Sequence, residues 1–199
     1  LAEAAMTKVS CPLGRDLWAA VATICVVSFL YTAGQCIFDS FFAVLARGSF
    51  GTNAAQIGFM QTLQATVALF ISAICFNPVQ KKIGIAGTSL IGLAFVTVGL
   101  WLMGTVSTLP LFVACACVYS VGVPLFTPTV PVLLVSCVPP SQRGLVLGVD
   151  AAVNTVGRTT VPIVLGALVV THGAPQDCFV IASALVAAAV AVTATRLFA

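Results

Sequence analysis

The most informative feature of this sequence is how little charge it carries. Only 7% of its 199 residues are charged, whereas 60% are hydrophobic. A soluble domain has about 25% charged residues, so most of the surface of this chain cannot face water. The net charge of +3 includes no cluster of lysine or arginine, which excludes a nucleic-acid-binding surface. We therefore expect the chain to lie in a lipid bilayer.

Motifs of catalysis and metal binding are also missing. The sequence has one histidine, His172, and its eight cysteines include no C-x2-C pair, so we expect no metal site. Neither H-E-x-x-H nor G-x-S-x-G occurs, so we expect neither an enzyme nor a bound cofactor. Because most of the cysteines lie in or beside apolar runs, we expect them to pack as small hydrophobic side chains and not to form disulfides.

Long apolar runs follow one another along the chain. A bilayer core about 30 Å thick needs roughly 20 apolar residues per helix, and backbone polar groups in lipid must be satisfied within helices or closed barrels. The runs are continuous and not alternating, which favours helices. We predict an all-α membrane protein, with a lead-in or inter-half linker at 1–16 and six transmembrane helices at 17–45, 54–76, 84–104, 109–136, 144–170 and 177–198.

The basic residues are unevenly divided between the two sides of this predicted bundle. One side holds only Arg47, and the other holds Lys8, Arg15, Lys81, Lys82, Arg143 and Arg196. The positive-inside rule then places both termini in the cytoplasm. The helices also divide into two triplets, each beginning with a long, interrupted helix, as in transporters built from inverted repeats.

Polar side chains recur along one face of the first predicted helix. The stripe consists of Ser28, Thr32, Gln35 and Asp39. Their spacing of four, three and four residues places them on one face of an α-helix. Tyr31 borders this stripe. An ionisable residue at membrane depth costs at least about 2.5 kcal/mol, so it normally faces protein or water. We interpret the stripe as the wall of a solute or proton pathway; alternatively, Asp39 caps the helix or pairs locally near Arg47.

The fifth predicted helix carries Asp150, Asn154 and Arg158 at intervals of four residues. Asp150 and Arg158 are about 12 Å apart along the axis at 1.5 Å per residue, which is too far for a direct ion pair. Arg158 lies near mid-span, and no acid of this chain is expected at its depth. We expect it to meet a solute anion or a carboxylate of another six-helix half; a structural ion pair between helices is the alternative.

The fourth predicted helix is the least regular. It contains Pro124, Pro128 and Pro131, and each proline removes a backbone hydrogen bond, which leaves carbonyl groups free to meet water or solute. Thr127 and Tyr119 add hydroxyl groups nearby. We expect a broken helix that lines the pathway and takes part in gating, with a static kink as the alternative. Tyr119 is also a candidate packing residue.

Glycines at short intervals mark the fifth predicted helix. Gly144 and Gly148 form a G-x-x-x-G pair, and Gly157 and Gly166 continue the pattern. Small residues at this spacing let two helices approach closely. We therefore predict tight packing of this helix against a neighbour.

Two stretches resemble motifs of the major facilitator superfamily. The run PPSQRG at 139–144, with Arg143 and Gly144, is followed by Gly157-Arg158 and Pro162, and together they resemble the start and course of that family's eleventh helix. The run NPVQKKIG at 77–84 is similar to the weaker copy of the family's cytoplasmic loop signature, with Lys82 and Gly84 kept and Lys81 at a position that is usually acidic. The nearest group is the drug:proton antiporters, including tetracycline-type exporters.

The resemblance implies the carboxy-terminal half of a twelve-helix secondary transporter for a small solute, with H+ as a candidate coupling ion. The first and fourth helices would line the central path, the second and fifth would contact the missing amino-terminal half, and the third and sixth would face lipid. The two halves would rock around a mid-membrane site. The alternative is a complete six-helix protein that pairs with a second copy as a carrier, channel or membrane scaffold.

Overall fold

The chain is helical throughout the part that its structure, a computed structural model, describes: residues 17–172 and 175–198. Those residues form no strand. The elements in order are α2 (Leu17–Phe50), α3 (Ala54–Phe70), the π-helix η1 (Ile71–Cys75), α4 (Phe76–Thr105), α5 (Leu109–Phe126), α6 (Thr129–Cys137), the 3-10 turn η2 (Pro140–Gln142), α7 (Arg143–His172) and α8 (Pro175–Phe198).

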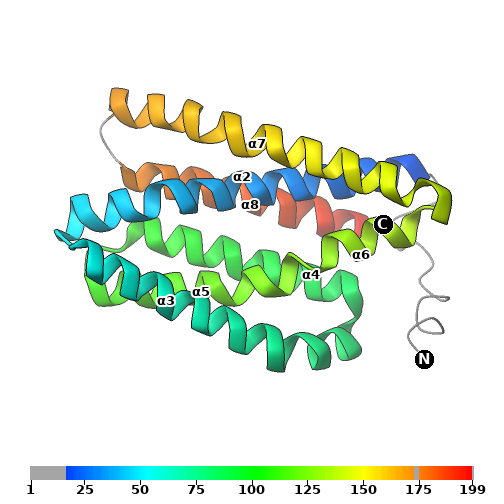
Figure 1. Cartoon of the computed structure of the whole chain (residues 1–199), viewed down its shortest axis with the longest axis horizontal. Coiled ribbons are helices and arrows are strands. Elements are labelled where there is room, and N and C mark those ends of the chain that lie inside the picture. Colours follow the sequence, from blue (N-terminus) through cyan, green and yellow to red (C-terminus); the bar gives the residue numbers. More distant parts are fainter. Residues whose placement is uncertain (1–16, 173–174, 199) are drawn as a thin grey trace.

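Four stretches of the described chain are long and apolar enough to cross a membrane. They are Trp18–Phe50, Ala54–Thr105, Leu109–Cys137 and Gln176–Thr195. The second is 52 residues long and includes α3, η1 and α4; the chain reverses direction near Gly84, inside α4 (Figure 1). α7 is not among them, and its polar residues include Asp150, Asn154 and Arg158. The all-helical membrane class is confirmed, and the division into six spans stays a prediction.

The turn at Gly84, inside α4, corrects a predicted boundary. We expected a helix to end at Asn77-Pro78, but the backbone stays helical to Gly84, where φ is 80°. Pro78 cannot donate to the carbonyl four residues earlier, and the wide turn of η1 lies directly before it. Glycine reaches the left-handed φ without a Cβ clash, so Gly84 ends the run. The exposed residues Lys81 and Lys82 therefore lie in a helical turn and not in an irregular loop.

The stretch predicted as a broken helix at 109–136 is interrupted once. α5 ends at Phe126 and α6 begins at Thr129, with Thr127 and Pro128 in a turn between them. Pro124 lies inside α5 without ending it. Pro131 lies in the first turn of α6, where backbone N–H groups have no intrahelical partner, so proline is tolerated there.

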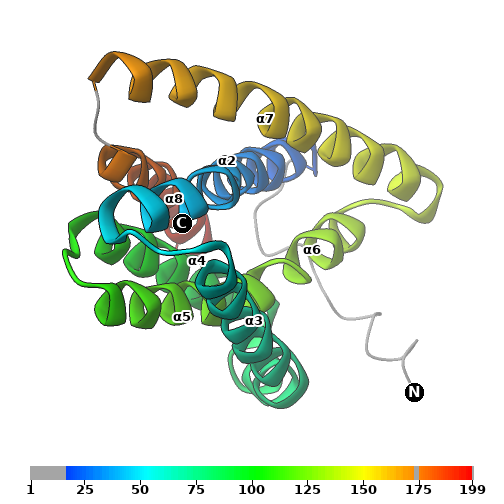
Figure 2. The same cartoon turned by 60° about the vertical axis from the view of Figure 1, so that its left-hand side comes forward.

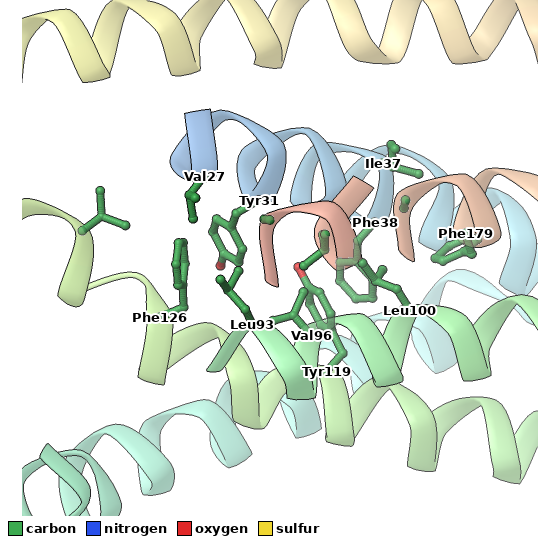
Figure 3. Packing of buried hydrophobic residues seen from close by; sticks show 14 of the residues in the cluster. Val27, Tyr31, Ile37, Phe38, Leu93, Val96, Leu100, Tyr119, Phe126 and Phe179 are labelled. Carbon is green, nitrogen blue, oxygen red and sulfur yellow. The ribbon is translucent and has the colours of Figure 1, made fainter. Parts of the chain in front are cut away.

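The core lies between α2, α4, α5 and α8, and aromatic rings fill much of it (Figure 3). The ring centroids of Tyr31 and Phe126 are 4.3 Å apart, and Phe38 stacks on Tyr119 at 4.2 Å. From α4, Leu93 and Leu100 reach the same cluster and have no exposed surface. These contacts fix α2 against the helix pair α4–α5.

Glycine allows the closest helix approach, between α4 and α5. A Cβ on Gly122 would lie 2.5 Å from the carbonyl oxygen of Gly92, and one on Gly99 would lie 2.7 Å from Cα of Tyr119. By contrast, a Cβ on Gly144 or Gly148 would meet nothing within 4 Å. The predicted tight packing of that G-x-x-x-G pair is therefore wrong within the described chain.

α3 and α7 lie at opposite edges of the bundle in both views (Figures 1 and 2). α7 packs mainly on α2, and α3 packs mainly on α5. Large apolar side chains point away from the chain on both edges: Phe59 of α3 is 72% exposed and Ile163 of α7 is 68% exposed. Each edge helix is thus covered on one side only by this chain.

The cysteines depart from prediction at one position. Free thiols are Cys25, Cys36, Cys75, Cys115, Cys117 and Cys178, each buried or half-buried as a packing residue would be. Cys137 is disulfide-bonded, so the expectation that no cysteine forms a disulfide is wrong.

Candidate functional site

A polar cavity of about 290 Å³ lies where α2, α6 and α7 meet. Its lining combines eight polar or charged side chains with three apolar ones at or beside the break between α5 and α6. The lining residues are Ser28, Tyr31, Thr32, Gln35, Phe126, Thr127, Val130, Pro131, Asp150, Asn154 and Arg158. Four come from α2 and three from α7.

The cavity brings together most of the residues singled out in the sequence. The polar stripe of α2 faces the polar stripe of α7 because these helices pack side by side, and their shared lining includes Tyr31, Gln35, Asp150, Asn154 and Arg158. Thr127 and Pro131 join them from the break in the α5–α6 span. Sequence reasoning missed Phe126 and Val130, which carry no polar signal and become wall residues only through their place beside the break.

Asn154 connects the two polar stripes. Its Nδ2 donates to Ser28 Oγ at 2.8 Å and to Asp150 Oδ2 at 3.0 Å. The remaining side-chain oxygens, Asp150 Oδ1 and Asn154 Oδ1, are buried and accept no hydrogen bond from the described residues. A buried acceptor without a donor costs about 1–3 kcal/mol, so these two oxygens are the costly atoms of this polar cluster.

Tyr31 contacts the broken helix. Its hydroxyl lies 3.2 Å from Thr127 Oγ1, within hydrogen-bond distance, and its ring packs on Phe126. The contact joins α2 to the turn between α5 and α6. A movement of that turn would therefore change the cavity wall directly.

Arg158 is exposed and lines the cavity. No described residue forms an ion pair or a hydrogen bond with it, so its guanidinium donors are free to meet a solute. The exposed Asp39 on α2 is within range of its charge, although Asp39 does not line the cavity. The expectation that no acid of this chain lies at the depth of Arg158 stays a prediction.

The other predicted residues lie elsewhere. Tyr119 is 3% exposed and stacked on Phe38, so it packs in the core and does not line this cavity. Pro124 lies in the last turn of α5 and Pro128 lies in the α5–α6 break, and neither lines the cavity; Pro162 lies one turn beyond Arg158 in α7. The loop-signature residues also lie outside the cavity lining, in the first part of α4 and at the start of α7: Lys81, Lys82, Gly84, Arg143 and Gly144. The described residues contain no group of His, Cys, Asp or Glu side chains that could hold a metal.

Long apolar helices around a cavity that contains an unpaired arginine and an aspartate define a class: transport proteins embedded in a membrane. The model of the Major Facilitator Superfamily matches residues 24–199. The chain therefore belongs to the Major Facilitator Superfamily. Members of this superfamily carry small solutes across membranes and are not enzymes, so this chain is an integral, multi-pass membrane protein of transport. Among curated proteins, none matches the chain.

Proposed function

We propose that the chain is one six-helix half of a twelve-helix secondary transporter, which moves a small solute by alternating access through the cavity between α2, α6 and α7. The observation that carries this proposal is the convergence of two polar helix faces on one cavity. A broken helix beside a binding site is typical of such carriers, and the break at Thr127–Pro128 adjoins the cavity through Tyr31.

The two edge helices support a second half. The outer face of α3 exposes Gln61 as well as Phe59 and Leu69, and a glutamine amide is costly against lipid. α7 exposes Gly144 and Gly148, where another helix can approach closely. By contrast, the exposed faces of α4 and α8 carry apolar side chains such as Phe95, Val98 and Ile181, which suit lipid. The alternative, pairing of two copies of this chain, predicts a stable dimer in mild detergent. The mass of the purified protein in that detergent therefore distinguishes a dimer of this chain from a protein with a different second half.

Coupling to H+ is the second part of the proposal. Asp150 lines the cavity, Asp39 is within range of the charge of Arg158, and a carboxylate at membrane depth is a common proton carrier in transporters. The excess of basic residues on one side supports cytoplasmic termini. Exchange of a solute for protons would agree with the resemblance to drug:proton antiporters.

A flux experiment tests the proposal. The intact protein that contains this chain is reconstituted in proteoliposomes, loaded with one unlabelled solute of a panel and diluted into the same solute in radiolabelled form. A carrier takes up the radiolabelled solute transiently above its equilibrium level, because the inward-facing site returns with unlabelled solute bound. If transport is coupled to H+, an imposed proton gradient changes the rate of this uptake. Flux that rises linearly with concentration and shows no such overshoot indicates a channel and contradicts alternating access.

A further inference from the structure

The cavity keeps its two charges apart. Asp150 and Arg158 are eight residues apart on α7, which is about 12 Å along the helix axis. Asp150 has Asn154 and Ser28 beside it, whereas the charge of Arg158 reaches Tyr31 and Asp39. The cavity therefore has an acceptor end at Asp150 and a donor end at Arg158.

The chemistry of the two ends is complementary to opposite ligand groups. At the acceptor end, Asp150 and Asn154 line the cavity, and an ionised carboxylate such as that of Asp150 only accepts hydrogen bonds. An ammonium group supplies the opposite charge and the donors. At the other end, a guanidinium only donates, and its fork matches the two oxygens of a carboxylate.

We propose that the solute is a zwitterion whose ammonium binds Asp150 and Asn154 and whose carboxylate binds Arg158. This inference rests on the proposed transport function. A solute with a single charge would meet a group of opposite charge at only one end of the cavity and would add a net charge at membrane depth, which is costly. A zwitterion pairs both ends and adds no net charge to the site.

The spacing of the two ends narrows this class. The distance between the two ends requires several bonds between the charges. An ω-amino acid meets this requirement, whereas an α-amino acid carries its charges too close together.

Two isomers give a matched test on the intact protein, purified in detergent. 6-Aminohexanoate and 2-aminohexanoate have the same atoms and differ in the spacing of their charges. Each is titrated by calorimetry beside hexylamine and hexanoate, which carry one charge each. We expect 6-aminohexanoate to bind at least about tenfold more tightly than the other three, since it makes one more charge-assisted contact than each of them.

Charge-neutral variants assign the two ends. Arg158→Gln should weaken hexanoate about tenfold and leave hexylamine unchanged, whereas Asp150→Asn should do the reverse. Controls are Arg47→Gln and Asp177→Asn, which alter exposed charges outside the cavity. Binding of the two isomers with equal affinity overturns the proposal, and this comparison needs no variant to fold. A singly charged or uncharged solute that shows overshoot in the flux experiment also overturns it and leaves the transport function standing.

Discussion

Arg158→Gln reduces solute flux at least about tenfold, because it removes a charged hydrogen-bond donor from the solute cavity. Arg158 has the one cationic side chain in the cavity lining, and no described residue neutralises it through an ion pair. Glutamine keeps a polar side chain of similar length, so the protein should still insert and fold. The measurement is the initial rate of uptake, in proteoliposomes, of whichever solute the wild-type protein carries.

Arg47→Gln is the matched control for this variant. Arg47 is an exposed arginine in the last turn of α2, outside the cavity lining, and its replacement should leave flux within about twofold of wild type, as expected for a surface charge. Loss of protein from the membrane with Arg158→Gln would point to a structural ion pair. Full flux with normal expression would remove Arg158 from the pathway.

Gly122→Val should lower the amount of folded protein more than any change on the exposed face of α7. The new Cβ would lie 2.5 Å from the carbonyl oxygen of Gly92 and 2.8 Å from the backbone nitrogen of Val96. Both atoms belong to the backbone of α4, so the two helices must separate. Overpacking costs about 1–3 kcal/mol when side chains give way, and a backbone clash costs more.

Gly148→Val adds the same atoms on α7, where a Cβ meets nothing within 4 Å. We expect its thermal midpoint in detergent to stay within a few degrees of wild type, as is usual for an exposed site, while Gly122→Val gives aggregated protein or a much lower midpoint. Equal midpoints for the two variants would show that α4 and α5 do not meet at Gly92 and Gly122.

The two polar stripes were predictable because lipid makes polar groups costly. Ser28, Thr32 and Gln35 on α2, like Asp150 and Arg158 on α7, repeat at helical spacing, and each stripe has to face protein or water. That the two stripes face each other across one cavity did not follow from either helix alone. It depends on α2 and α7 packing side by side.

The tight helix contacts could not be predicted from sequence spacing. Gly92, Gly99 and Gly122 lie on two helices and form no G-x-x-x-G pair, so their contact appears only when α4 and α5 pack. The G-x-x-x-G pair that the sequence does contain, Gly144 and Gly148, faces outward from this chain. A G-x-x-x-G pair shows that another helix can pack closely at this position, but it does not show which helix that is.

Tyr119 and the helix break show a second limit. The hydroxyl of Tyr119 suggested a pathway residue, but its ring stacks on Phe38 in the core. Three prolines predicted an interrupted helix, and the break lies at Thr127–Pro128, while Pro124 is accommodated inside α5. Local chemistry therefore indicates that a helix is weakened, and tertiary packing decides where it breaks.

Access to the cavity from the two sides of the membrane is the direct test of alternating access. Gln35→Cys places a thiol in the cavity lining, and Val98→Cys places one on the exposed apolar face of α4. Each is made in a protein whose free cysteines are replaced by serine, reconstituted in one orientation and treated with a membrane-impermeant maleimide from one side at a time. We expect Gln35→Cys to react from both sides and Val98→Cys to react from neither. Reaction of Gln35→Cys from one side only, or no faster than Val98→Cys, would contradict it.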